Sequence, residues 1–222
     1  MKRAIHAFAA LVVVVCSGCA TESSRTIEAP TVASAGTTYQ GPRSVLAVGK
    51  FDNRSDYMRG IFSDGGDPLG SQAKTILITH LQMTGRFSVL DRDNMSEIGQ
   101  EARIAGAAQK LKGADFVVTG NVTAFGRKEV GDQQLFGILG RGKSQVAYAK
   151  VALNIVNVLT SEVVYSVQGA GEYTLSDREV IGFGGTSGYD STLTGKVLDL
   201  AIREAVNNLV AGVQSGAWNP GH

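Results

Sequence analysis

Cysteine is almost missing from this chain of 222 residues. Only Cys16 and Cys19 occur, both near the N-terminus, so the rest of the chain can form no internal disulfide. The fold must therefore be held together by core packing or by oligomerisation. Histidine is also rare: His6 and His222 lie near the ends, and His80 falls on a predicted helix beside its apolar stripe. We interpret His80 as a structural residue rather than a ligand, and we expect no metal site, no cofactor and no catalytic set.

The chain also has no large excess of positive or negative charge. The 21 lysines and arginines nearly balance the 20 aspartates and glutamates, which argues against a nucleic-acid partner. Hydrophobic runs are short: the one at residues 4–15 is too short to span a membrane as a helix. Binding to nucleic acid is therefore not expected, and this run needs another explanation.

The N-terminus has the layout of a secretory signal peptide. Two basic residues precede the apolar run, and the small residues Ser17 and Gly18 lead directly into Cys19. Cleavage before a cysteine is typical of a bacterial lipoprotein, in which residues 1–18 are removed and Cys19 is lipidated. Residues 19–42, rich in Ser, Thr, Ala and Gly, would then form a flexible tether. We expect an exported, membrane-anchored protein; the alternative is an N-terminal hydrophobic strand.

A single domain is expected over residues 43–218. Helix caps at Asp67 and Asp93, and a helix beginning at Ser191, alternate with strand patterns. Strands are predicted at residues 44–51, 87–90, 114–125, 145–158 and 163–175. In the last of these, apolar and polar residues alternate, as in a strand with one buried face. The pattern predicts an α+β fold in which helices pack against one sheet.

Residues 137–144 match the phosphate-binding pattern G-x4-G-K-[ST] letter for letter. That motif needs a buried strand before it and a helix after it, because the helix N-terminus binds the phosphate. Here the preceding stretch is polar, and the following stretch alternates as a strand. We interpret the match as a glycine-rich hairpin tip, with a nucleotide site as the alternative. We predict that the protein is not an enzyme.

Two glycine-rich hairpins, at residues 127–149 and 169–189, fit poorly into a compact domain. In the second, apolar and aromatic residues fall on alternate positions on both sides of a turn predicted at residues 176–178. Strands that cross a membrane have this pattern, and so does an ordinary hairpin with one buried face. Since the strands of one chain cannot close such a barrel, membrane-spanning hairpins would require a ring of subunits that share one.

Four stretches of the chain are similar to one known family. They are residues 101–109 (EARIAGAAQ), residues 156–164 (VNVLTSEVV), the Phe136–Ile138 turn, and the end of the final helix through Gly216 and Trp218. The family is that of the curli-secretion channels, the CsgG-type outer-membrane lipoproteins. The likeness covers nearly all of the chain beyond the tether.

The resemblance implies a closed ring of about nine identical lipid-anchored subunits in the bacterial outer membrane, with periplasmic domains and one shared barrel. Unfolded curli-type amyloid or adhesin subunits would diffuse through the barrel without ATP hydrolysis, in some cases with a periplasmic accessory factor. The family's pore constriction lies in the loop after the first strand, which corresponds to residues 52–67. Tyr57, Phe62 and Asp64 are therefore the predicted constriction residues; an ordinary loop is the alternative.

Two other functions stay open at the level of sequence. One keeps the assembly and changes the cargo, so that the protein exports or anchors a holdfast-type adhesin. The other is a periplasm-facing lipoprotein that binds partners, such as an activator of cell-wall synthases, and never spans the membrane. The length and polarity of the two hairpins distinguish these possibilities.

Overall fold

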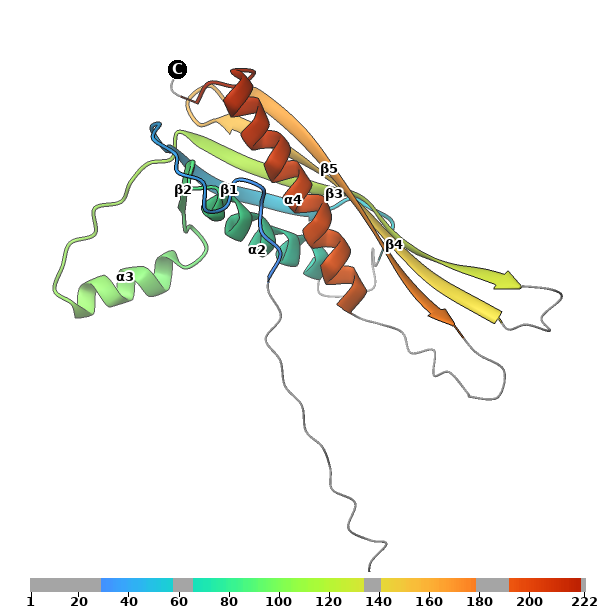
Figure 1. Cartoon of the computed structure of the whole chain (residues 1–222). Coiled ribbons are helices and arrows are strands. Elements are labelled where there is room, and N and C mark those ends of the chain that lie inside the picture. Colours follow the sequence, from blue (N-terminus) through green and yellow to red (C-terminus); the bar gives the residue numbers. More distant parts are fainter. Residues whose placement is uncertain (1–28, 58–65, 134–140, 179–191, 221–222) are drawn as a thin grey trace, which may run out of the picture.

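A computed structural model describes residues 29–57, 66–133, 141–178 and 192–220 (Figure 1). Its elements, in chain order, are β1 (Ser44–Asn53), α2 (Pro68–Met83), β2 (Phe87–Leu90), α3 (Met95–Ile104), β3 (Phe116–Gln133), β4 (Arg141–Asn157), β5 (Val163–Arg178) and α4 (Thr192–Ser215). They confirm the predicted α+β fold of one sheet with helices packed against it. The signal region and Cys19 lie outside the described residues.

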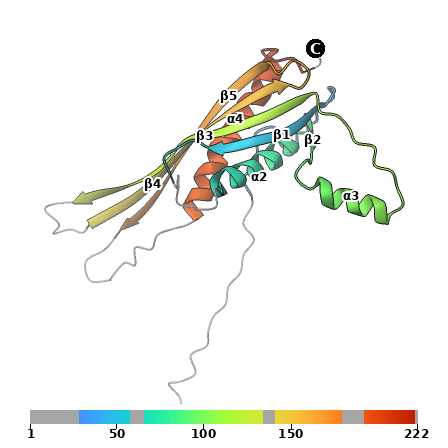
Figure 2. The same ribbon diagram turned by 180° about the vertical axis from the view of Figure 1, so that it is seen from behind.

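The sheet has the strand order β2-β1-β3-β4-β5. Strand β1 is parallel to both of its neighbours, whereas β3, β4 and β5 form an antiparallel meander. Figures 1 and 2, seen from opposite sides, place α2 and α4 together on one face of this sheet. The core therefore lies between that face and the two helices, and β2 and β5 are the edges of the described sheet.

The start of α2 confirms the cap predicted from Asp67 and Pro68. One carboxylate oxygen of Asp67 accepts a hydrogen bond from the backbone N–H of Gly70 at 2.8 Å, and Pro68 occupies the first turn. The other oxygen accepts from the backbone N–H of Asn53 at 2.6 Å. A single side chain thus satisfies a free helix amide and joins the end of β1 to the start of α2.

Long apolar side chains from the sheet and from the helix layer fill the core. Leucine, isoleucine and valine from the sheet meet the apolar stripes of the helices, and those with no exposed surface include Leu46, Val118, Leu153, Ile155, Leu77, Leu198, Ile202 and Leu209. Trp218 closes one end of the core, stacked on Tyr165 at 6.0 Å and edge-on to Phe116 at 5.5 Å between ring centroids. The chain beyond α4 is therefore part of the core.

Strand β5 has the alternation predicted for it. Val167 and Gly169 are buried beneath α4, whereas Ser166, Gln168 and Ala170 are exposed on the other face. The sheet therefore has one face covered by α2 and α4 and one face that carries the exposed polar residues of β5.

A β-bulge in β3 changes which side chains face the core. Val122 is buried on the helix side, the register slips between Val122 and Ala124, and Phe125 is again buried. The extra residue, Thr123, lets Phe125 point toward the helices although it lies an odd number of positions after Val122. The bulge lies just before the point where β3 leaves the helix layer.

Two local predictions were wrong. The predicted turn at residues 176–178 is strand, because these residues pair with residues 142–144 of β4. The second helix begins after Asn94, whose side chain makes no capping bond, and Asp93 instead forms an ion pair with Lys74. In both places the local sequence pattern was misleading because the residues concerned interact with another helix or strand.

Candidate functional site

Strands β3, β4 and β5 continue beyond the helices as a three-stranded ribbon, which both views show (Figures 1 and 2). Among the described side chains, the contacts of this ribbon with α4 include a hydrogen bond from Arg127 to Thr194 and the ammonium of Lys196 over the Tyr173 ring at 5.3 Å. We define the strand extension as the paired segments beyond these contacts: residues 128–133, 141–146 and 174–178.

The strand extension keeps a continuous antiparallel register. Arg127 pairs with Ala147, and the pairing runs without a break to Gln133 and Arg141. On the other side of β4, Gly142 pairs with Arg178, so that β5 reaches almost as far as its neighbours. The residues that would join these strands, 134–140 and 179–191, lie outside the described residues.

The phosphate-loop match falls partly in this extension. Residues 141–144 are extended and pair with β3 on one side and β5 on the other. A phosphate loop would place the lysine at the start of a helix, whose amide groups bind the phosphate. Lys143 is instead within a strand, so the described part of the motif lacks the geometry that nucleotide binding requires.

Of the three predicted constriction residues, only Tyr57 lies among the described residues. Its ring is half-buried against Phe125, with the ring centroids 4.6 Å apart. Its backbone carbonyl accepts a hydrogen bond from the Asn53 side chain at 2.7 Å, which keeps the chain after β1 close to the sheet. Phe62 and Asp64 lie outside the described residues, and the constriction stays a prediction.

A groove of about 660 Å³ lies between the outer edge of β5 and α4. Gly169 and Gly171 make room for α4: a Cβ on Gly169 would lie 2.1 Å from the carbonyl oxygen of Ala201. At the groove, the side-chain amide of Asn208 donates to the carbonyl oxygen of Gln168 at 2.9 Å. Sequence analysis missed this groove because its two walls come from elements that only the fold brings together.

Charged side chains line the groove without forming ion pairs within the described part of the chain. They are Lys150 and Glu172 from the sheet and Arg203 and Glu204 from α4. Arg203 is half-buried, whereas the other three are exposed. The groove therefore offers both signs of charge, together with the small residues of β5, to a partner that enters from the sheet edge.

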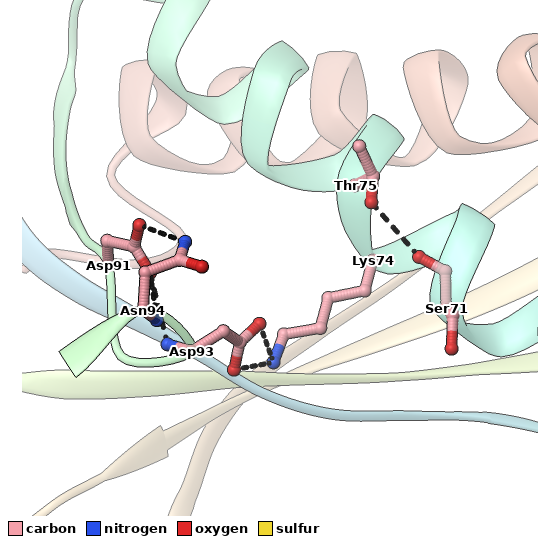
Figure 3. Close-up of polar contacts among 6 residues, drawn as sticks. All are labelled: Ser71, Lys74, Thr75, Asp91, Asp93 and Asn94. Atoms are coloured by element: carbon pink, nitrogen blue, oxygen red, sulfur yellow. Dashed lines mark hydrogen bonds and ion pairs between the residues drawn. The ribbon is translucent and has the colours of Figure 1, made fainter. Parts of the chain in front are cut away.

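Helix α3 is attached at its base, where Asp91, Asp93 and Asn94 precede it and Lys74 reaches Asp93 (Figure 3). The carboxylate of Asp91 accepts hydrogen bonds from the backbone N–H groups of Asp93 and Asn94 and from the Asn94 side chain at 2.6 Å. These bonds, first of all the one from the Asn94 side chain, hold the pKa of the Asp91 carboxyl below its usual value. Lys74 of α2 binds Asp93 at 2.6 Å, while no residue of α3 is buried.

His80 joins the two core helices. Its ring is buried, and its Nε2 lies 2.8 Å from a carboxylate oxygen of Asp199 on α4. Within the described ranges, no group of three or more His, Cys, Asp or Glu residues is arranged to hold a metal ion. The geometry agrees with the interpretation of His80 as a structural residue.

Replacing Asp199 with alanine is expected to lower the free energy of unfolding by about 1–3 kcal/mol, because it leaves a buried histidine nitrogen without its partner. Urea denaturation at neutral pH measures the loss. Asp199→Asn is the matched control: its amide oxygen can still accept a hydrogen bond, so the loss should be clearly smaller. Equal losses for the two variants would contradict the proposed role of the pair.

The comparison with protein families gives a decisive match. Residues 31–220 match the model of the family described as "Curli production assembly/transport component CsgG". The chain belongs to the CsgG family. This confirms the resemblance inferred from the four stretches of sequence, and the match includes the core, the strand extension and α3.

A relative in Neisseria meningitidis serogroup B (strain MC58) supports the assignment. The protein, named "Putative lipoprotein NMB1126/NMB1164", is 71% identical over 204 residues, which are 92% of each chain. Together, the family and this relative assign the chain to the CsgG-type lipoproteins. In the part of the chain that the structure describes, no helix is long and apolar enough to cross a membrane.

Solved structures are similar only at a distance. The PelC dodecamer from Paraburkholderia phytofirmans is 16% identical, with 82% of this chain and 95% of that chain covered and a TM-score of 0.35. Lipoprotein GNA1162 from N. meningitidis is also 16% identical, with 77% and 99% covered and a TM-score of 0.36. Similarity at this level says nothing about how the CsgG-family chain described here assembles.

Proposed function

We propose that this CsgG-family protein is lipidated at Cys19 and forms a ring of identical subunits in the outer membrane. In this proposal, the ring is a channel that secretes unfolded subunits of an extracellular fibre or adhesin. The main support for this proposal is the strand extension. Its three strands stay paired without a break as they continue from the core past the described helices.

The length of the extension is compatible with a membrane strand that continues into the neighbouring residues. Six residues of β3 beyond Arg127 span about 20 Å at about 3.3 Å per residue. A membrane strand needs about 9–11 residues, so the remainder would have to come from residues 134–140 and 179–191. The first arm of the hairpin at residues 169–189 reaches Arg178, which leaves residues 174–178 of β5 beyond the contact of Tyr173 with α4.

A hairpin in a membrane has open strand edges, and these edges require several copies of the chain to pair with one another. Backbone N–H and C=O groups without partners are costly in hydrocarbon, so the outer strands of one copy must pair with those of the next. Identical head-to-tail contacts close into a ring when the rotation from one copy to the next is a whole fraction of a full turn. Residues 52–67, which follow β1, would narrow the pore, with Tyr57, Phe62 and Asp64 as the proposed constriction.

The test is planar-bilayer conductance of the detergent-extracted full chain, with particle shape examined by electron microscopy. We expect ring-shaped particles and large, stable conductance that does not change when ATP is added. Monomers or small oligomers without conductance would contradict the channel and favour a lipid-anchored protein that binds partners in the periplasm.

A shortened hairpin provides the matched control. Because Arg127 pairs directly with Ala147, residues 128–146 can be replaced by Asn-Gly, a two-residue turn suited to a hairpin. Among the deleted residues whose burial is described, only Val146 is buried, so thermal stability should fall slightly while conductance is lost. Unchanged conductance in this variant would show that the strand extension does not form the channel.

A further inference from the structure

Helix α3 has no buried side in the described part of the chain. It has ten residues, and none is buried; Ile98 is 42% exposed and Ile104 is 71% exposed. Helices this short are marginal in water unless another surface covers their apolar side. Its attachment through Asp91 and Asp93 fixes the base of α3 and leaves its length available to a partner.

The arrangement of subunits in the proposed ring determines which surface of the next subunit lies opposite α3. If β3, β4 and β5 of each copy enter one barrel, the β5 side of one copy must face the β2 side of the next. Helix α3 follows β2 and lies at that end of the sheet, far from β5, in both views (Figures 1 and 2). The groove between β5 and α4 lies at the opposite edge.

From this arrangement we infer that α3 of one subunit docks in the groove between β5 and α4 of the next. The inference rests on the proposed ring, and it assigns the contact that joins the soluble domains of neighbouring subunits.

The apolar stripe of α3 suits the small residues that β5 presents in the groove. Ile98 and Ala102 form an apolar stripe on α3, and the wall of β5 in the groove consists of Gly169, Ala170 and Gly171. Small residues of this kind let a helix approach a strand closely.

Charge supports the same pairing. Glu97 and Glu101 lie four residues apart on α3, where like charges repel each other on an isolated helix. Lys150 and Arg203 line the groove beside Glu172 and Glu204, and none of the four forms an ion pair among the described residues. Docking would bring the two carboxylates of α3 toward the two cations of the groove.

Cysteine crosslinking tests the contact, because the mature chain has no free cysteine once Cys19 carries lipid. We expect the full-length double variant Ile98→Cys/Ala170→Cys to give, after oxidation, a ladder of dimers, trimers and larger species. A head-to-tail contact produces such a ladder, whereas a two-fold contact stops at dimers. Each single variant, and the pair Ile98→Cys/Lys50→Cys with one cysteine on exposed Lys50 of β1, should give no ladder.

A second variant separates docking from folding. Ile98→Asp should remove ring particles yet leave the thermal midpoint of the monomer unchanged, because Ile98 is not buried within its own chain. Ring particles with conductance but no ladder would overturn this inference and leave the proposed channel in place. Absence of rings from the unmodified protein would overturn the proposed channel, and this inference with it.

Discussion

Replacing Gly169 with alanine is expected to lower the free energy of unfolding by about 3 kcal/mol, because the new methyl group would overlap the backbone of α4. The added Cβ would lie 2.1 Å from the carbonyl oxygen of Ala201 and 2.4 Å from the backbone nitrogen of Ala205. Backbone atoms cannot rotate away as a side chain can, so α4 would have to move off β5. For a domain of this size the thermal midpoint should fall by roughly 6–12 °C.

The matched control for this prediction is Gly113→Ala. No atom lies within 4 Å of the Cβ that this change would add, and Gly113 does not have a positive φ. The control should leave the thermal midpoint unchanged or raise it slightly, since alanine restricts the unfolded chain. Thermal unfolding followed by circular dichroism measures both variants. Equal midpoints would show that α4 does not pack on Gly169 as described.

Replacing Cys19 with alanine is expected to abolish lipidation altogether, because no other residue of the mature chain has a thiol that could accept the lipid. Incorporation of labelled palmitate measures the modification, and cell fractionation measures the consequence. The unlipidated protein should fail to reach the outer-membrane fraction, because the lipid on Cys19 is the proposed signal for its sorting there.

Cys16 provides the control for the lipidation experiment. It lies three residues before Cys19 and directly after a run of valines, so signal cleavage should remove it. Cys16→Ala should therefore leave both labelling and fractionation unchanged. If labelling persists in Cys19→Ala and is lost in Cys16→Ala, the lipidated residue is Cys16. If the fractionation of Cys19→Ala is unchanged, the proposed lipid anchor is contradicted.

Elements with strong local signals could be predicted from the sequence. The cap at Asp67 specifies the start of α2, because its carboxylate satisfies a backbone amide only three residues away. The alternation in β5 predicts its buried face, because side chains alternate between the two faces of every strand. Both features depend on neighbours in the chain, and both were found where the pattern placed them.

Elements that depend on distant contacts were predicted less well. Residues 176–178 have the composition of a turn, yet they are extended because β4 provides a pairing partner for each of them. Asp93 resembles a helix cap, but its carboxylate binds Lys74 of another helix instead. Neither partner is visible in the local pattern, since each comes from another element.

The sequence by itself determined the α+β fold class and the resemblance to the CsgG family, and it predicts the lipoprotein signal. These follow from interactions between residues close in the chain and from residue patterns that can be recognised in the sequence alone. Only the tertiary structure decided the length of β5, the pairing of His80 with Asp199, and the exposure of α3 opposite the groove between β5 and α4. Each of these depends on surfaces that lie far apart in the chain, and strand pairing and helix packing alone bring them to their places.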